Sequence, residues 1–396
     1  MLQIIGYHID RDSRTIFTSN GEKCSKSPYI DFLLKEQDAI RVCYQLDFFI
    51  ANLLKFIGLS DKQLIQLHDT SELSTNGYKF KFVPKKFFSI IKDEKFVVLS
   101  DASQYMERYD LLGDPLEKAK EAQKVGVQVY NALSRLGLHP KSLISPIATF
   151  EKEVLFKMDL PTIDDMPEEA AQYAYECCTG PIICSYQKGK FEKCWDYDLV
   201  SAYASKLSEC IDYRYGSWEK IDHFDPTAHY GFYLSNVDMT ANFHPIVYAR
   251  HNEESHCPLG EWQRKSTQDE LNFITNYKRG TWEVEDGWVF HPTKIVKPYK
   301  KVIDWLHSQK EKSTGMQRKI VKRIQEGLWG YTLRIDWNGE TATPSEHMNT
   351  VFGCQTETPV KLEVAKFVID NQLEEFLLSI AVDGVLATKE VNLPKS

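Results

Sequence analysis

The chain has 396 residues, of which 42% are hydrophobic and 12% aromatic, and its formal net charge is −8. This length predicts two or three domains, and this apolar content argues against a globally disordered chain. The acidic total argues against a protein that coats nucleic acid by bulk charge, although a local basic groove remains compatible with it.

Nothing in the sequence predicts a membrane protein. No uninterrupted apolar run reaches about 18 residues, and the opening MLQIIGYHIDRD lacks the basic start of a signal peptide. We expect a soluble cytoplasmic protein, in the host cytoplasm if the chain is viral. The nine cysteines lack the paired spacing of a zinc ribbon. Cys177, Cys178, Cys184 and Cys194 cluster, and we interpret them as reduced buried thiols, with a metal site as the alternative.

The first 160 residues have a mixed α/β pattern. Strand-length apolar runs occur at Leu2–Ile5, Phe80–Val83 and Phe96–Leu99. Helical spacing covers Phe48–Ile57 and Pro115–Leu136. The stretch Asp159–Glu169, with two prolines and several acids, is predicted to be a linker.

The second part begins near Ala170 and again alternates strands and helices. The predicted elements are a strand at Ile182–Cys184, a turn at Gln187–Lys190, a strand at Phe191–Tyr197, a helix at Ser201–Cys210, a helix that begins at the capping box Thr267–Glu270, helices at Tyr299–Lys310 and Met316–Leu328, a helix near Leu362–Phe376, and a hairpin of Ser379–Val382 and Val385–Thr388. The two helices joined by Lys312–Gly315 form an αα-hairpin.

Asp198 lies where a predicted strand gives way to a helix. A carboxylate there, beside a backbone carbonyl such as that of Leu199, offers the hard oxygen ligands that Mg²⁺ prefers. The structural alternative is that Asp198 caps the helix.

Asp383 precedes Gly384 between two apolar strands. Asp-Gly in this context is a strong signal for a two-residue hairpin turn. The turn explains Gly384 without assigning any chemistry to Asp383, so structural and metal-binding interpretations both stay open here.

A strongly basic stretch lies between these two acids in the sequence. Residues 294–323 hold ten lysines or arginines against Asp304 and Glu311. Within it, Ile320, Val321, Ile324 and Leu328 form an apolar helical stripe, and Arg318, Lys322, Gln325 and Trp329 are predicted to share the opposite face. Such a face suits a triphosphate and a base, although a solvated face is the alternative.

The three sites together contain the parts that phosphoryl transfer needs. That chemistry requires divalent cations held by carboxylates and cationic side chains that neutralise a triphosphate. A strand-end aspartate, a cationic helix and a hairpin aspartate supply them in this order.

In this order the motifs resemble those of family B DNA polymerases, especially the compact viral and protein-primed branch. That family carries DxxSLYPS, KxxxNSxYG and YxDTDS. The chain has Asp198-Leu-Val-Ser201-Ala-Tyr203-Ala-Ser205, then Lys322-Arg-Ile-Gln-Glu326-Gly327-Leu-Trp329-Gly330, then Ile380-Ala381-Val-Asp383-Gly384. Glu326-Gly327, Ala381 and Gly384 depart from the family. The resemblance, which includes His244-Pro245 and Pro258-Leu-Gly260-Glu-Trp262, covers roughly residues 173–390.

The resemblance implies an α+β fold with four parts. These are an RNase H-like, exonuclease-like domain at 1–165, a first part of the palm (an antiparallel sheet with helices) at 166–295, a two-helix fingers hairpin at 296–331 and a second part of the palm at 332–396. It implies a DNA-directed DNA polymerase that serves viral or mobile-element replication, with primer–template DNA and deoxynucleoside triphosphates as partners.

The resemblance also implies roles for single residues. Asp198 and Asp383 would be catalytic and bind two Mg²⁺ ions, or Mn²⁺, with the Leu199 carbonyl assisting. Tyr203 would exclude a ribose 2′-OH, with Ser201 beside it in the same motif. The substrate contacts would further include Lys322, Arg318, Lys310, Lys312 and Trp329.

Two departures define the alternatives. The DxE motif of the exonuclease is missing, Asp10 and Asp12 being its nearest substitutes, so we predict a proofreading-dead domain. Only 13 residues follow Asp383, so we expect no thumb unless a separate thumb or accessory subunit supplies one. The first alternative is a catalytically weak or inactive polymerase-like module that binds DNA or a subunit. The second is a two-metal nuclease that uses Asp10, Asp12 and Asp47.

Overall fold

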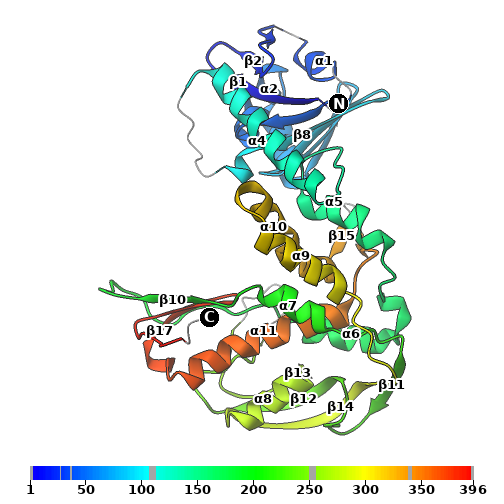
Figure 1. Cartoon of the computed structure of the whole chain (residues 1–396), viewed down its shortest axis with the longest axis vertical. Helices are drawn as coiled ribbons and strands as arrows, with labels where there is room; N and C mark the ends of the chain where they lie inside the picture. The colour runs from blue at the N-terminus through cyan, green and yellow to red at the C-terminus, as the bar shows by residue number, and fades with distance from the viewer. Residues whose placement is uncertain are drawn as a thin grey trace. The chain divides into compact units, whose positions relative to one another are not determined.

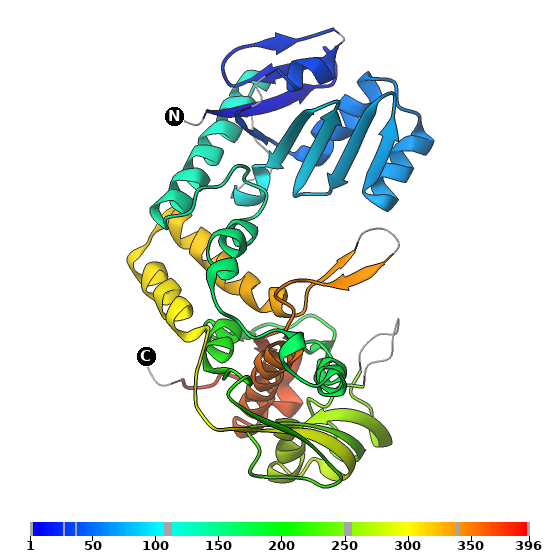
Figure 2. The same ribbon diagram turned by 90° about the vertical axis from the view of Figure 1, so that its right-hand side faces the viewer.

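The computed structural model describes residues 3–26, 28–35, 38–106, 113–248, 256–337 and 341–393, without the side chains of 336 and 337. It divides into two compact units (Figures 1 and 2). The first unit is Met1–Lys157 with Lys310–Ile324, and the second is Met158–Gln309 with Gln325–Ser396. The expectation of a mixed α+β chain is confirmed, whereas the four-part division stays a prediction.

The first unit is built on an eight-stranded sheet in the order β3-β2-β1-β4-β8-β7-β6-β5. Its strands are β1 (Ile4–Asp10), β2 (Thr15–Thr18), β3 (Lys23–Cys24), β4 (Ile40–Cys43), β5 (Glu72–Thr75), β6 (Tyr78–Val83), β7 (Phe87–Lys92) and β8 (Lys95–Asp101). β1, β4 and β8 run parallel, and the other pairs are antiparallel. The sequence indicated only β1, β6 and β8. β2, β3, β4 and β5 have two to four residues each, whereas β7 was missed although it is as long as β6.

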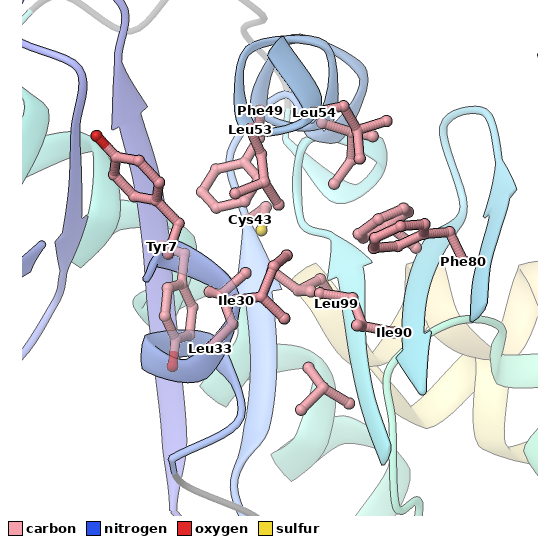
Figure 3. Close-up of a cluster of buried hydrophobic side chains, with 14 of the residues drawn as sticks. Tyr7, Ile30, Leu33, Cys43, Phe49, Leu53, Leu54, Phe80, Ile90 and Leu99 are labelled. Carbon is pink, nitrogen blue, oxygen red and sulfur yellow. The ribbon is translucent and has the colours of Figure 1, made fainter. Parts of the chain in front are cut away.

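Alternation along β1 sends side chains to two helical layers. Tyr7 packs with Phe49 and Leu53 of α2 (Leu46–Phe56) in a buried core that also receives α1 (Tyr29–Leu33) and α3 (Asp61–Thr70). Figure 3 shows Tyr7, Cys43, Phe49 and Leu53 in this core. On the opposite face, α4 (Pro115–Arg135) crosses Gly6 closely enough that a Cβ there would overlap the Ala119 carbonyl oxygen. The helix α5 (Pro146–Glu153) completes this part of the unit.

The second unit contains two four-stranded sheets, ordered β10-β18-β17-β9 and β11-β14-β12-β13. Their strands are β9 (Ile183–Ser185), β10 (Trp195–Asp198), β11 (Gly216–Ile221), β12 (Tyr230–Met239), β13 (Gly260–Thr267), β14 (Gly280–Pro292), β17 (Leu377–Ala381) and β18 (Gly384–Ala387). The helices of this part of the chain, of which α10 continues from the first unit, are α6 (Glu168–Cys177), α7 (Ala202–Glu209), α8 (Gln268–Asn276), α9 (Lys300–Lys312), α10 (Gly315–Thr332) and α11 (Thr350–Asp370). A small hairpin pairs β15 (Ile335–Trp337) with β16 (Ala342–Pro344).

The long helix α11 differs from the sequence-based expectation. A helix beginning near Leu362 was predicted, but α11 begins at Thr350 and continues through Pro359. Proline removes one backbone N–H and normally breaks a helix. Here Thr356, Glu357 and Thr358 are buried at 0–1% exposure, so tertiary packing outweighs the local preference.

The expected linker is an ordered part of the second unit. Asp159 pairs with Arg214, the Thr162 carbonyl accepts from the Tyr213 hydroxyl, and the Pro161 carbonyl accepts from Asn349. Proline and acidic residues therefore marked a change of unit here without marking a free connection. Within the described residues, no helix is long and apolar enough to cross a membrane.

The close crossing of α4 over Gly6 yields a stability prediction. Gly6→Ala places a Cβ against the Ala119 carbonyl and 2.7 Å from the Gln123 nitrogen. We expect a loss of at least about 1–3 kcal/mol in unfolding free energy, because backbone atoms must move. Gly126→Ala is the control, since its Cβ would meet only side-chain methyls at 3.1–3.2 Å and alanine favours the helix by about 1 kcal/mol. Urea unfolding compares the two variants, and equal stabilities would contradict the prediction.

Candidate active site

Antiparallel pairing of β10 with β18 brings Asp198 and Asp383 together. Asp198 is the last residue of β10 and is paired with Gly384, the residue after Asp383. The Leu199 N–H then donates to the Asp383 carbonyl at 3.1 Å. Asp198 is exposed and Asp383 half-buried, so both carboxylates lie at one solvent-accessible end of this sheet.

The turn that carries Asp383 differs from the predicted one. Ala381 pairs with Gly384 across the hairpin, which leaves Val382 and Asp383 as the two turn residues. The positive φ, +64°, falls on Val382 and not on the glycine. The predicted position of the turn, at Asp383-Gly384, is therefore wrong by one residue. Gly384 belongs to a strand.

Val382 is strained. A β-branched residue with positive φ is a true outlier, and such conformations cost of order 1–3 kcal/mol and concentrate at functional sites. The Val382 N–H donates to the Ile182 carbonyl at 3.0 Å. This bond and the one between Leu199 and Asp383 hold the turn from both sides.

The structure does not support the helix-capping interpretation of Asp198. The N-cap of α7 is Ser201, which has φ 53° and makes no side-chain capping bond. Among the described residues, no hydrogen bond or ion pair of the Asp198 side chain is recorded. Its Oδ1 lies 3.8 Å from where a Cβ on Gly384 would stand, so the missing side chain of Gly384 leaves space beside the carboxylate.

Two aromatic rings lie near these carboxylates in the second unit. The rings of Tyr203 and Trp329 are 4.7 Å apart at 39°, and the Trp329 indole N–H donates to the Gly353 carbonyl of α11 at 2.9 Å. Burial raises the pKa of Tyr203, and the nearby carboxyls of Glu357 and Asp383 raise it further. The Tyr203 phenol is therefore neutral, and it lies close enough to Asp383 for the charge of that carboxylate to affect it.

A buried charge network supports this region, and sequence reasoning missed most of it. Lys361 donates to Glu270 at 3.1 Å and to Thr179 at 3.0 Å, and Arg264 contacts Glu270 at 3.1 Å. Cys178 donates to Glu357 at 2.8 Å. The sequence indicated only the capping role of Glu270, which the structure confirms. The i,i+4 spacing of Glu357 and Lys361 was the remaining signal.

The two carboxyls of this network respond to burial differently. Burial raises the pKa of Glu357, and the charge of Lys361 offsets this only partly. Burial acts in the same direction on Glu270, but the charges of Arg264 and Lys361 hold the pKa of Glu270 below its ordinary value. The wall of a pocket of about 690 Å³ includes Arg264, Glu357 and Trp329.

The predicted cations lie on α9 and α10, in the segment Lys310–Ile324 that belongs to the first unit. Arg318 donates to the Lys310 carbonyl at 2.9 Å, while Lys312 and Lys322 are exposed. The apolar stripe of α10 is confirmed, with Ile320, Val321, Ile324 and Leu328 fully buried.

The prediction that Gln325 lies on an open polar face of α10 is wrong. Gln325 is 3% exposed and contacts His307 of α9 at 3.2 Å. Helical spacing indicated one wide polar face, but the packing of α9 against α10 covers part of it.

Asp10 and Asp47, two of the acids that the nuclease alternative would use, have different contacts in the first unit. Asp10 bonds to Ser13 in the turn after β1, and Asp47 accepts from the Lys85 N–H at 2.9 Å. Burial raises the pKa of Asp101, with Asp47 adding to the effect. The structure therefore brings Asp47 near Asp101, which the sequence did not single out.

Among the described residues, no group of three or more histidine, cysteine or acidic side chains is placed to hold a metal. Of the clustered cysteines, Cys177 is buried and Cys178 half-buried, whereas Cys184 and Cys194 are exposed. The expectation of four buried thiols is thus wrong for the last two, which flank an exposed connection. Asp198 and Asp383 are two carboxylates without a closed cage, and such a pair suits Mg²⁺, which commonly binds through one or two carboxylates and substrate phosphates.

The chain is similar in fold to solved structures of Phi29 DNA polymerase. The orthorhombic crystal form matches with a TM-score of 0.65 and 12% identity, covering 100% of this chain and 81% of that chain. The complex with primer-template DNA and incoming nucleotide substrates matches with 0.64 and 13%, and the single-stranded DNA complex with 0.62 and 13%, at the same coverage. No family model and no curated protein matches the sequence.

The raised pKa of Glu357 yields a pH prediction. A carboxyl whose folded pKa exceeds its unfolded value stabilises the fold fully below the unfolded pKa and loses that contribution as pH rises through the folded pKa. We therefore expect wild-type unfolding free energy to fall relative to Glu357→Gln as pH rises above about 4.3. Urea unfolding at successive pH values measures this, with Glu219→Gln on exposed β11 as the control. A Glu357→Gln curve parallel to wild type would contradict it.

Proposed function

We propose that this chain is a DNA-directed DNA polymerase that adds deoxynucleotides to a 3′ end, and that it serves viral or mobile-element replication. The observation that carries the proposal is the meeting of Asp198 and Asp383 beside the strained Val382 turn. Asp198 is not the N-cap residue of α7, which is Ser201, and strain persists where the surrounding structure enforces it. The same fold occurs in Phi29 DNA polymerase, whose solved complexes hold primer-template DNA and incoming nucleotide substrates.

Asp198, Asp383 and the Leu199 carbonyl would hold two Mg²⁺ ions, or Mn²⁺. When bound, the metals supply charge neutralisation for a triphosphate and a more acidic 3′-hydroxyl. The carboxylates fit this purpose because they are hard oxygen ligands on adjacent segments, and Gly384 keeps the surface beside Asp198 open. The hydrogen bonds of Leu199 and Val382 fix the backbone from which the Asp383 carboxylate projects.

Tyr203 and Trp329 would form the surface beneath the incoming nucleotide. Their rings are held by the indole bond to Gly353 and by burial. A bulky ring under the sugar leaves no room for a 2′-hydroxyl, so Tyr203 would select deoxyribose, and Ser201 would be a further substrate contact.

The cations Lys322, Arg318, Lys310 and Lys312 would neutralise the triphosphate. Phosphoryl transfer depends mainly on positioning and charge stabilisation, and arginine and lysine are its usual protein ligands. This role rests on the order of the motifs along the chain and on the charge of residues 294–323.

We expect Asp383→Asn to lower primer extension at least about 100-fold, because even the partners of metal ligands contribute 10–100-fold when lost. The measurement uses a labelled primer–template, Mg²⁺ and deoxynucleotides. Asp196→Asn is the matched control, since Asp196 is exposed on β10, two residues before Asp198, and should retain activity within a few-fold. Undiminished extension by Asp383→Asn would refute the metal role. DNA binding without extension by wild type would favour the non-catalytic alternative, to which Ala381 and Glu326 already point.

Tyr203→Ala is expected to raise ribonucleotide incorporation relative to deoxynucleotide incorporation by at least about tenfold, as contacts that discriminate small groups commonly do. Single-nucleotide extension with each substrate measures the ratio. Phe232→Leu in the other sheet of the second unit, a buried aromatic substitution, controls for general loosening of the unit. An unchanged ratio in Tyr203→Ala would remove Tyr203 from sugar selection.

A further inference from the structure

The connection between β9 and β10 is a protruding basic segment. β9 and β10 are consecutive in the chain but occupy opposite edges of the sheet β10-β18-β17-β9. The connection must therefore cross the sheet, and it does so at the end away from Asp383, where Tyr186 and Gln187 donate to the Leu378 carbonyl. Residues 183–194 are all exposed, and the green ribbon beyond β10 shows this segment in Figure 1.

The charge of this segment is largely uncompensated. We call residues 186–194 the lysine loop, because it contains Lys188, Lys190 and Lys193 against the single acid Glu192. In the described part of the chain, no ion pair of these lysines is recorded, whereas Lys206, Lys220 and Lys297 each pair with an acid. The Lys193 ammonium lies over the Trp195 ring, 4.5 Å from its centroid, and Trp195 pairs with Ala387 on the face opposite Asp198, so Lys188 and Lys190 are the lysines that this contact leaves out.

An open face of the sheet leads from the lysine loop to the two aspartates. Cross-strand register places two rows of side chains on this face, namely Asp198, Gly384, Ala381 and Ile183, and then Asp196, Leu386, Ser379 and Ser185. The opposite face packs Ile380 and Val385 with Val364 and Val368 of α11. Four of the eight open-face residues are glycine, alanine or serine, so small side chains make up half of this face.

The length of this face along the strands corresponds to the rise of several base pairs of duplex DNA. At about 3.3 Å per residue, an extended chain places Lys193, two residues before β10 begins at Trp195, about 17 Å from Asp198, and Lys190 at most about 26 Å away. One base pair advances a duplex by about 3.4 Å. A duplex whose 3′ end lies at Asp198 and Asp383 would therefore reach the lysines about five to eight base pairs behind that end.

We propose that the lysine loop binds the sugar–phosphate backbone of the product duplex about five to eight base pairs behind the 3′ end. The proposal rests on the proposed function, which places the 3′ end at the two aspartates. Its occupant follows from charge complementarity, since duplex DNA carries about one negative charge per 1.7 Å. The loop thus contributes to affinity for duplex DNA and has no part in the chemical step.

The test compares Lys188→Gln/Lys190→Gln/Lys193→Gln with the control Lys55→Gln/Lys62→Gln/Lys95→Gln. The control removes the same charge from exposed positions of the first unit. Fluorescence anisotropy measures the dissociation constant of a labelled primer–template over a range of salt concentrations. Each lost phosphate contact lowers the slope of log K against log salt by about 0.9. We expect the loop variant to lower it by about 2, through Lys188 and Lys190, and the control to leave it unchanged.

A second arm varies the duplex length from four to twelve base pairs behind a fixed 3′ end. Wild type should gain affinity as the duplex passes about five to eight base pairs, and the loop variant should lose that gain. An unchanged salt slope, or a loss that is equal at every duplex length, would overturn the proposal and leave the loop as a surface for another partner.

The two proposals can fail separately. Binding is measured without nucleotides, so a wild type that fails to extend a primer still reports on the loop. Conversely, extension by the loop variant at saturating DNA, with the wild-type single-turnover rate, would confirm that the loop acts in binding alone. A loop variant with a reduced single-turnover rate at saturation would contradict a pure binding role.

Discussion

The pairing of β10 with β18 is the constraint on which the candidate site depends. It joins two segments far apart in the chain, and the Leu199 N–H closes the pairing on the Asp383 carbonyl at 3.1 Å. A shift of this register by one residue would turn Asp198 to the side of the sheet covered by α11, because neighbouring strand residues face opposite sides. Tyr197 of β10 opposes such a shift, because its ring packs 5.2 Å from that of Phe367 on α11 and would become exposed.

The strained turn connects this register to the buried charges. The Val382 N–H bonds to Ile182, which closely follows Thr179 and Gly180, and Lys361 holds Thr179 at 3.0 Å. Lys361 and Glu270 are 2% and 0% exposed. Buried ion pairs are weak contributors to net stability but can enforce one arrangement over others. Here their placement ties α11 and α8 to the segment that supports Asp383.

Local patterns in the sequence predicted the parts of the site, and tertiary contacts decided the rest. The capping box at Thr267, the stripe of Ile320, Val321, Ile324 and Leu328, and the strand that ends at Asp198 follow from short-range rules. The start of α11 before Pro359, the burial of Gln325 and the network around Glu357 depend on neighbours distant in the chain. The position of the turn was missed because Asp-Gly is the commoner signal, whereas β-sheet register places the positive φ on Val382.

The lysine loop also bears on self-association. Both outer strands of the sheet, β9 and β10, have one side unpaired within the described residues, and Ile183 on β9 is 72% exposed. Such edges are templates for strand addition by a second copy, and proteins commonly guard them with lysine. Because the lysine loop joins these two edges, its like charges would repel an approaching copy at either one. The same residues would thus disfavour edge-to-edge pairing between two copies of this sheet.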